Sequence, residues 1–296
     1  AINQDGEGQI WVGYDNEGLE VIDSNGVSQC IVNNSTDIYS LGNNSIRTIY
    51  RDNNNGMWVG TNKKGISVYY PCEYKFESTS FADVNCISQA YKDTEHVWIG
   101  TDKDGLLKYN YRHKRIVNSI YPDEKSNHAI VCLYPDDKGG VWIGTYNNGM
   151  FYYINGSTKH FTIEDGLSSN NIWAIVPYNG NHLLIGTLGG GIQTYDKTTN
   201  SFETFNTANS RLTTDYVNTI VKGRNGQFYI GTTYGICQFS PSAKSVSYLN
   251  IENLSNKTIN QLLIDSRGLL WIATRDGLNV YDTDKRHLYP VVLNQS

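Results

Sequence analysis

The feature that most constrains the fold is a short phrase that recurs along the 296 residues: a large apolar residue, then Ile or Val, then Gly or Ala, and usually Thr. It begins at Trp11, Trp58, Trp98, Trp142, Leu184, Tyr229 and Trp271. The gaps between these seven copies are 47, 40, 44, 42, 45 and 42 residues, a mean period near 43. Such a period with strand-type composition is typical of propeller blades, because helical repeats of similar length show a 3.6-residue periodicity.

Each repeat reads as four short strands. An alternating segment such as 46–52 or 259–265 ends in a turn rich in Asp, Asn and Gly, which tolerate the backbone angles of a short hairpin. The recurrent phrase is the second strand, and a Gly-containing turn, a period-two third strand and a more variable fourth strand follow. We therefore predict an all-β fold, a seven-bladed β-propeller of four-stranded antiparallel blades. The expected blades are approximately 1–40, 41–80, 81–124, 125–166, 167–210, 211–253 and 254–296.

The repeated aromatic residues have a structural explanation. A blade cannot bury both faces alone, and a Trp at the same place in successive blades can bury ~150–250 Å² between neighbours. We expect this of Trp58, Trp98, Trp142 and Trp271. We expect the Gly after each to be needed where neighbouring backbones come close.

The length is accounted for by the repeats. With a period near 43, residues 1–296 hold just under seven units, so we expect a single propeller and no second domain. The chain starts part-way through a repeat, since residues 1–5 align with residues 48–52. We therefore expect it to be a fragment of a longer protein.

Composition and reactive residues exclude several kinds of site. The chain has 24 Lys and Arg against 29 Asp and Glu, and no basic stretch, so we expect no nucleic-acid partner. Six scattered His and five Cys without a Cys-x-x-Cys pair predict no metal, no cofactor and no catalytic residue. Residues 52–56 are as short as a hairpin turn, and residues 189–191 open a strand, so neither is a calcium or phosphate loop. Cys72 with Cys86 is the one pair to inspect for a disulfide.

The repeats resemble a known family. Residues 166–175 read Gly-Leu-Ser-Ser-Asn-Asn-Ile-Trp-Ala-Ile, residues 184–187 read Leu-Ile-Gly-Thr, and residues 191–196 read Gly-Ile-Gln-Thr-Tyr-Asp. This pattern is similar to the two-component regulator propeller repeat, and residues 136–153 and 265–282 match its second half nearly as well. The resemblance covers all seven units.

The resemblance implies a periplasmic sensor of a hybrid two-component system of the Bacteroides type. Members of that family carry two propellers, a small β-sandwich, a membrane helix and a histidine kinase. They sense glycan breakdown products and regulate polysaccharide utilisation. The implied partners are a glycan-derived oligosaccharide or other small ligand and the second propeller and β-sandwich of the same receptor, and a homodimer is left open. The fragment itself would be no enzyme.

Two other functions stay open. Streptogramin-lyase-like propellers have similar blades and carry a catalytic His and Glu on one face, but here no His falls in a loop between second and third strands. A non-catalytic scaffold or secretion-associated propeller would share every feature of the sensor. Detection of glycan binding would separate the sensor from the scaffold.

We expect the ligand on the face that carries the loops between second and third strands together with the connections between blades. Aromatic faces there suit pyranose rings, and polar side chains suit hydroxyls. Positions early in innermost strands should lie near the channel mouth. The candidate ligand-binding residues are Arg47, Asp102, Asp104, Tyr146, Asn147, Trp173, Asn218, Tyr234, Asn260, Arg275 and Asp276. Each alone is better explained as a solvated turn residue, and only the set forms the hypothesis.

Overall fold

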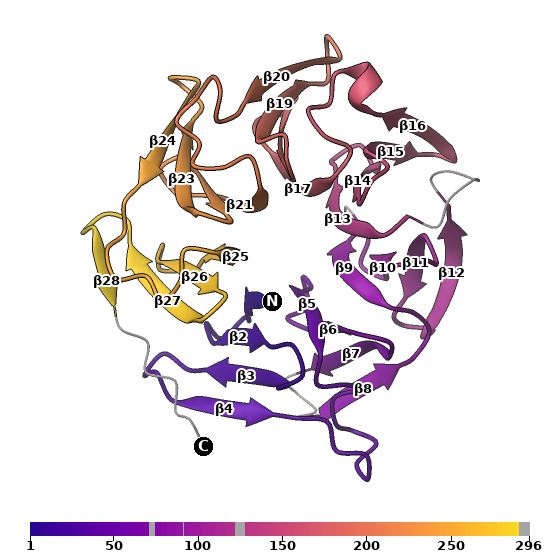
Figure 1. Ribbon diagram of the computed structural model, residues 1–296. Coiled ribbons are helices and arrows are strands. Elements are labelled where there is room, and N and C mark those ends of the chain that lie inside the picture. The colour runs from indigo at the N-terminus through magenta and orange to yellow at the C-terminus, as the bar shows by residue number, and fades with distance from the viewer. Residues whose placement is uncertain (71–74, 91, 122–127, 290–296) are drawn as a thin grey trace. The chain divides into compact units, whose positions relative to one another are not determined.

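The computed structural model (Figure 1) describes residues 1–70, 75–90, 92–121 and 128–289. They form seven four-stranded sheets, each with its strands in chain order and antiparallel, and the fold is the predicted seven-bladed β-propeller. Within the described residues the one helical element is a 3-10 turn, η1 (Ile163–Asp165), capped by Thr162. None of the helical structure in these ranges is long or apolar enough to cross a membrane.

The strands of the first four blades are β1 (Ile2–Gln4), β2 (Ile10–Gly13), β3 (Leu19–Ile22), β4 (Ser28–Ile31); β5 (Ile46–Arg51), β6 (Met57–Thr61), β7 (Gly65–Tyr70), β8 (Lys75–Thr79); β9 (Val84–Gln89), β10 (His96–Thr101), β11 (Leu106–Asn110), β12 (Arg115–Ile120); and β13 (Ile130–Pro135), β14 (Val141–Thr145), β15 (Met150–Ile154), β16 (Ser157–Phe161). Those of the last three are β17 (Ile172–Pro177), β18 (His182–Thr187), β19 (Ile192–Asp196), β20 (Ser201–Phe205); β21 (Val217–Lys222), β22 (Phe228–Thr232), β23 (Gly235–Ser240), β24 (Ser245–Leu249); and β25 (Ile259–Ile264), β26 (Leu270–Thr274), β27 (Gly277–Asp282), β28 (His287–Tyr289).

The chain divides into two compact units. Unit 1 includes residues 1–143 and 152–158, and unit 2 includes residues 144–151 and 159–289. Unit 1 thus holds the first three blades, unit 2 holds the last three, and the fourth blade is divided between them. Each sheet falls within one expected blade, whereas the assignment of the whole chain to a single domain stays a prediction.

Within each unit the first strands of successive blades lie side by side. In unit 1 these are β1, β5, β9 and β13, and in unit 2 they are β17, β21 and β25. The fourth strands are at the opposite edge of each sheet, and β12 is exposed along five of its six residues. The first strands therefore form the inner edge of each unit, and the fourth strands form its outer edge.

Several of the repeated aromatic residues pack between blades as predicted. The ring of Trp58 in blade 2 lies edge-on to Tyr109 and Tyr111 of blade 3, at centroid distances of 6.1 and 5.6 Å. The Trp98 ring meets that of Tyr153 in blade 4 at 6.2 Å. Trp142 differs, because it stacks on Tyr152 of its own blade at 4.4 Å.

An aspartate at the first hairpin ties the turn to the Trp that follows six residues later. Asp52 accepts hydrogen bonds from the backbone N–H groups of Asn54 and Gly56 with Oδ1 and from Trp58 Nε1 with Oδ2, each 2.8 Å long. The same arrangement joins Asp5 to Trp11 and Asp265 to Trp271, at 2.9 Å each. Residues 52–56 therefore form a capped hairpin turn.

The Gly of the recurrent phrase leaves room for the next blade. A Cβ on Gly60 would lie 2.7 Å from Val84 Cγ1 of blade 3 and 2.5 Å from Thr48 Cγ2. A Cβ on Gly100 would lie 2.6 Å from Ile130 Cγ2 of blade 4. The close neighbour is thus a β-branched side chain at the start of the next innermost strand, and not a backbone as we expected from the sequence.

Candidate functional site

The loops between second and third strands are bound to the connections between blades. In unit 1 the N–H of Gly65 donates to the carbonyl of Ala82, and in unit 2 the N–H of Gly191 donates to that of Asp215, at 3.1 and 3.0 Å. These two Gly residues have φ of 71° and 77°, a region that favours Gly. In six blades the Thr that ends the second strand closes the loop by donating its hydroxyl proton to the Gly carbonyl, at 2.7–3.0 Å. Within each unit, loops and connections therefore share one rim, as predicted.

A β-bulge projects one side chain at this rim from the innermost strand of five blades. In each case the register shifts at the second residue of the first strand, which is left without a partner across the pair. The five bulged residues are Arg47, Asn85, Trp173, Asn218 and Asn260. Bulges re-aim side chains and are frequent next to binding sites. Four of these five residues are among the predicted site residues, and the fifth is Asn85.

In unit 1 the rim forms a small polar pocket of about 130 Å³ between blades 2 and 3. Its polar lining comes from the bulged residues Arg47 and Asn85, the loop residues Asn62 and Asp102, and the connecting residue Asp83. The Asn85 amide donates to Asp102 Oδ1 at 3.3 Å, and the Asp102 N–H donates to the Asp83 carbonyl at 3.1 Å. One guanidinium, two carboxylates and two amides thus line this pocket of about 130 Å³.

In unit 2 the rim carries an aromatic pair. The Tyr146 ring, which is 47% exposed, lies edge-on to Trp173 at a centroid distance of 6.1 Å. Beside it, the backbone N–H of Asn147 donates to Asn171 Oδ1 at 2.9 Å. An exposed aromatic face next to amide groups suits the apolar face of a sugar ring.

Other predicted residues lie on the rim of unit 2 in separate contacts. Lys257 Nζ lies 4.7 Å from the centroid of the exposed Tyr234 ring. The Asn218 amide donates to the Ile259 carbonyl at 2.8 Å, so it bridges two blades. Asp276 accepts a hydrogen bond from the Asn256 amide at 2.6 Å.

The remaining predicted residues are solvent-facing. Asn260 and Arg275 are exposed, and the backbone N–H of Arg275 donates to the Thr258 carbonyl at 3.0 Å. Asp104 is exposed at the tip of its loop, where its N–H donates to Thr101 Oγ1, and it does not line the pocket. The structure therefore brings Arg47 together with Asp102, and Tyr146 with Trp173.

Sequence reasoning missed three polar residues of the pocket, Asn62, Asp83 and Asn85. Asn85 follows Val84 at the start of a first strand, as Arg47 follows Ile46, so its position was a usable signal. Asn62 follows the strand-ending Thr61 directly, as Asp102 follows Thr101. Asp83 lies in a connection of variable length, which the period alone does not place.

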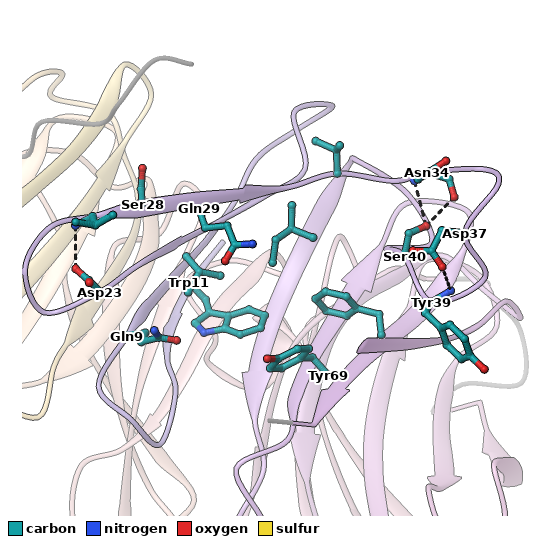
Figure 2. Close-up of a pocket in the computed structure, with 15 residues that line it drawn as sticks. Gln9, Trp11, Asp23, Ser28, Gln29, Asn34, Asp37, Tyr39, Ser40 and Tyr69 are labelled. Atoms are coloured by element: carbon teal, nitrogen blue, oxygen red, sulfur yellow. Dashed lines mark hydrogen bonds between the residues drawn. The ribbon is translucent and has the colours of Figure 1, made fainter. Parts of the chain in front are cut away.

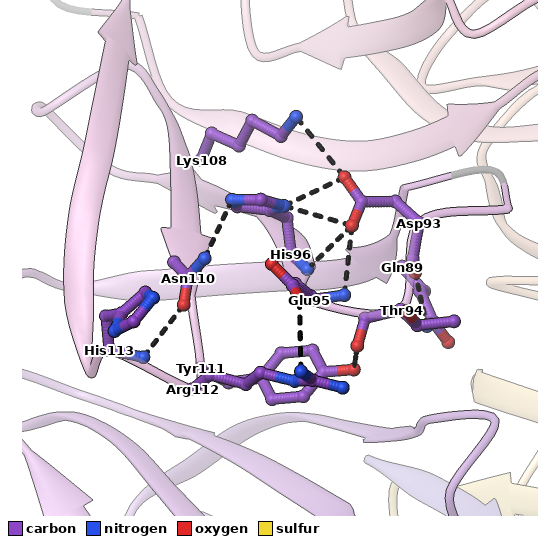
Figure 3. Close-up of polar contacts among 10 residues, drawn as sticks. All are labelled: Gln89, Asp93, Thr94, Glu95, His96, Lys108, Asn110, Tyr111, Arg112 and His113. Atoms are coloured by element: carbon purple, nitrogen blue, oxygen red, sulfur yellow. Dashed lines mark hydrogen bonds and ion pairs between the residues drawn. The ribbon is translucent and has the colours of Figure 1, made fainter.

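The sequence also gave no indication of a histidine–carboxylate contact in blade 3 (Figure 3). His96 Nδ1 lies 2.9 Å from Asp93 Oδ2, and Nε2 lies 3.0 Å from the amide nitrogen of Asn110. Lys108 Nζ lies 3.3 Å from the same Asp93 oxygen. Burial alone would raise the pKa of Asp93, but the hydrogen bonds from His96 and the backbone of Glu95 hold it below its usual value.

This histidine contact recurs in blade 5 and caps a hairpin in both cases. His182 begins β18 as His96 begins β10, and its Nδ1 lies 3.0 Å from Asn179 Oδ1. Its Nε2 lies 3.6 Å from Asp196 across the strand pair. Both histidines thus hold the turn between first and second strands and belong to the scaffold.

The described residues hold no group of three His, Cys, Asp or Glu side chains placed to bind a metal ion. Cys30, Cys86 and Cys237 are free thiols; Cys30 is exposed and Cys237 is buried. Burial raises the pKa of the Cys86 thiol well above its usual value. Cys72, the other half of the pair singled out from the sequence, lies outside the described residues.

The family comparison agrees with the resemblance read from the sequence. Residues 40–63, 123–147 and 253–276 match the two-component regulator propeller family. Each of these segments includes the first two strands of a blade, which are β5 and β6, β13 and β14, and β25 and β26. Among curated proteins, no sequence matches this chain significantly.

Solved structures with the same fold include extracellular domains of two-component systems and an enzyme. The extracellular domain of BT3049, assigned as a hybrid two-component system of B. thetaiotaomicron, is 21% identical at a TM-score of 0.57; the match covers 98% of this chain and 45% of that one. The extracellular domain of BT4673, assigned to the same class in that organism, is 22% identical at 0.55 and is covered over 42%, against 97% of this chain. Virginiamycin B lyase of Staphylococcus aureus is 12% identical at 0.75, with 94% of this chain and 92% of that chain covered. This chain thus spans less than half the length of the two extracellular domains.

Proposed function

We propose that this chain, which carries two-component regulator propeller repeats, is a ligand-sensing propeller from the periplasmic part of a hybrid two-component receptor. Its ligand would be a glycan-derived oligosaccharide, and its output would be the regulation of polysaccharide utilisation. The kinase, a second propeller and a β-sandwich would belong to the longer receptor.

The observation that carries the proposal is the set of five bulged residues at the rim. Within each unit they stand beside the loops that follow the second strands, so the scaffold presents side chains of different chemistry from equivalent backbone positions. The blade is repeated, but the bulged residue is Arg, Asn or Trp. Variation at a fixed position on a rigid element is the arrangement that ligand recognition needs.

The chemistry of the rim suits a neutral, hydroxyl-rich ligand. Carboxylates accept hydrogen bonds from hydroxyls, the guanidinium donates to ring and hydroxyl oxygens, and amides do both. In unit 1 the pocket supplies all three through Asp102, Arg47 and Asn85. In unit 2 the Tyr146 and Trp173 pair supplies the apolar face that pyranose rings pack against.

The proposed function needs no chemical step. A ligand that binds one arrangement of the receptor better than another shifts the population toward it by its differential affinity. The lyase alternative needs a base at the rim. None of the six histidines, all in the described part of the chain, lies in a loop between second and third strands, but His128 lies in the connection before β13 and His160 Nε2 lies 2.8 Å from the Asn148 carbonyl. The scaffold alternative predicts that no saccharide binds.

Titration calorimetry of the chain against a panel of glycan fragments tests the proposal. Asp102→Ala and Tyr146→Ala should each weaken binding of a fragment that binds the unmodified protein, by about tenfold for a lost charged hydrogen bond or stacked ring. Asp137→Ala is a matched control for the lost carboxylate, because Asp137 is exposed in the hairpin between β13 and β14, away from the rim. Unchanged affinity in both rim variants would exclude this rim as the site, and absence of binding across the panel would favour the scaffold.

A further inference from the structure

The exposed apolar side chains of unit 1 gather in two segments at its outer edge. Among the described residues of this unit, seven large hydrophobic side chains are exposed: Val27, Val32, Ile38, Tyr39, Ile116, Val117 and Tyr121. The first four fall in residues 27–39, the blade 1 edge, and the last three in residues 112–121, the blade 3 edge. Clustered exposed apolar residues mark interaction surfaces, whereas isolated ones are normal.

The blade 1 edge encloses a groove of about 540 Å³ (Figure 2). Trp11, Tyr69 and Phe76 form its floor, with ring centroids 5.3–6.3 Å apart. Ile31 and Val32 form part of its wall, where β4 ends and the connection to blade 2 begins. Trp11 and Phe76 are only 2% and 4% exposed, so the groove offers its aliphatic walls and the exposed Tyr39 side chain rather than its aromatic floor.

The charge of the blade 1 edge is of one sign. Residues 1–46 contain seven Asp and Glu and not one Lys or Arg. Asp23 and Asp37 line the groove itself. Asp37 Oδ1 accepts a hydrogen bond from the Tyr39 N–H, and its carboxylate is exposed. An occupant of this groove should therefore combine aliphatic side chains with positive charge.

The blade 3 edge of the same chain has that combination. Arg112, Lys114 and Arg115 fall within four residues, directly before the exposed Ile116 and Val117. Arg112 and Lys114 form ion pairs with Glu95 and Glu77, at 3.2 and 2.7 Å. Arg115 is exposed at the start of β12.

We propose that the blade 1 edge of one copy of this chain binds the blade 3 edge of a second copy. Blade 2 lies between the two edges in the chain and in unit 1, where β4, β8 and β12 are the outer strands (Figure 1). A two-fold axis near blade 2 therefore brings each acidic groove against the basic edge of the other copy. Such an interface is closed, because each copy supplies both halves of the contact.

The strand edges support the same arrangement. β4 and β12 each pair with a single neighbouring strand within the described residues. β12 carries the exposed Ile116 and Val117, and the exposed Val27 and Val32 flank β4 directly, so each edge is a surface that another chain can cover. Arg115 stands on this edge, so its charge selects an acidic partner surface and disfavours pairing between two blade 3 edges.

Sedimentation velocity over a range of protein concentration tests the proposal with two charge reversals, Arg115→Glu and Asp37→Arg. The unmodified chain should dimerise, and either variant alone should weaken dimerisation by at least about tenfold, because both contacts of its dimer then join like charges. An equimolar mixture of the two variants should regain the dimer, because each contact again joins opposite charges.

Matched controls and a second variant keep the result decisive. Lys138→Glu and Asp137→Arg make the same charge changes at exposed positions of the blade 4 hairpin and should leave dimerisation unchanged. Ile116→Ser should weaken the dimer without a change of charge. A monomeric unmodified chain would overturn the proposal, as would failure of the mixture to reassociate while both variants keep the circular dichroism spectrum of the unmodified chain.

Discussion

The bond between Asp52 and Trp58 makes the sharpest test of how a blade is held together. Asp52→Ala removes three hydrogen bonds at once, two from hairpin N–H groups to Oδ1 and one from the indole to Oδ2. Asp52 is 2% exposed and the Trp58 side chain is fully buried. Water therefore cannot replace the carboxylate as partner of the indole N–H unless the blade opens.

The magnitude follows from what the buried indole loses. A hydrogen bond to a charged group contributes about 1.5–3 kcal/mol, and a buried donor left without a partner costs about 1–3 kcal/mol. The two turn bonds are partly replaceable by solvent and resemble a helix cap, worth about 1 kcal/mol. We expect Asp52→Ala to lower the free energy of unfolding by about 3–5 kcal/mol.

Asp23 provides the matched control. It caps the hairpin between β3 and β4 through bonds to the N–H groups of Asn25 and Val27, at 2.8 and 2.9 Å, but that turn is exposed and no Trp is involved. Asp23→Ala should cost only about 1 kcal/mol. Urea unfolding followed by intrinsic fluorescence compares the two variants. Equal losses in both would refute the reasoning, because the buried indole bond would then contribute nothing.

Three further predictions concern acid stability, packing and thiol access. The pKa of Asp93 is lowered in the folded state, so the stabilisation by its carboxylate is present above the unfolded pKa of about 3.9 and is lost as pH falls through the folded pKa. Asp93→Asn should therefore flatten the pH dependence of the free energy of unfolding below about pH 4. An unchanged pH profile would contradict this. Gly60→Ala should destabilise the chain by about 1–3 kcal/mol in urea unfolding through overpacking, whereas Gly180→Ala, with open space around the added methyl, should be nearly neutral. A maleimide should label the exposed Cys30 quickly under native conditions and the buried Cys237, whose pKa burial raises, only on unfolding, as mass spectrometry of peptides would report.

The blade scaffold was largely predictable because it depends on local, repeated chemistry. The seven residues from Asp52 to Trp58 determine the hairpin turn, the close approach of Gly56 to the Asp52 carboxylate, and the hydrogen bond that holds the buried Trp58 ring. Each can be read without knowing the rest of the chain. The exception was the reason for Gly60, because the side chain it accommodates, Val84, comes from the next blade.

The candidate site was predictable in place but not in detail. The rim follows from the order of strands, and one pocket on it is lined by Arg47 and Asp102, two of the residues predicted from the sequence, whose binding of a ligand stays a prediction. The bulge that aims Arg47 is a shift of backbone register, and Arg, Asn and Trp at the bulged positions share no side-chain property that would reveal it. The groove at the blade 1 edge depends on how a four-residue strand, β4, leaves space beside blade 2, which no local pattern encodes.

The fit between Gly60 and Val84 has a consequence for how such a chain can be rebuilt. A blade carries a recess at its second strand and a filling residue at the start of its first, so it can be exchanged for another blade that has both, with no adjustment in its neighbours. The residue directly after the filling residue is the bulged one, as Asn85 follows Val84. Exchanging one blade for another would therefore change one rim side chain and its loop while the junction stays constant, which makes the repeat a unit for altering what the rim binds.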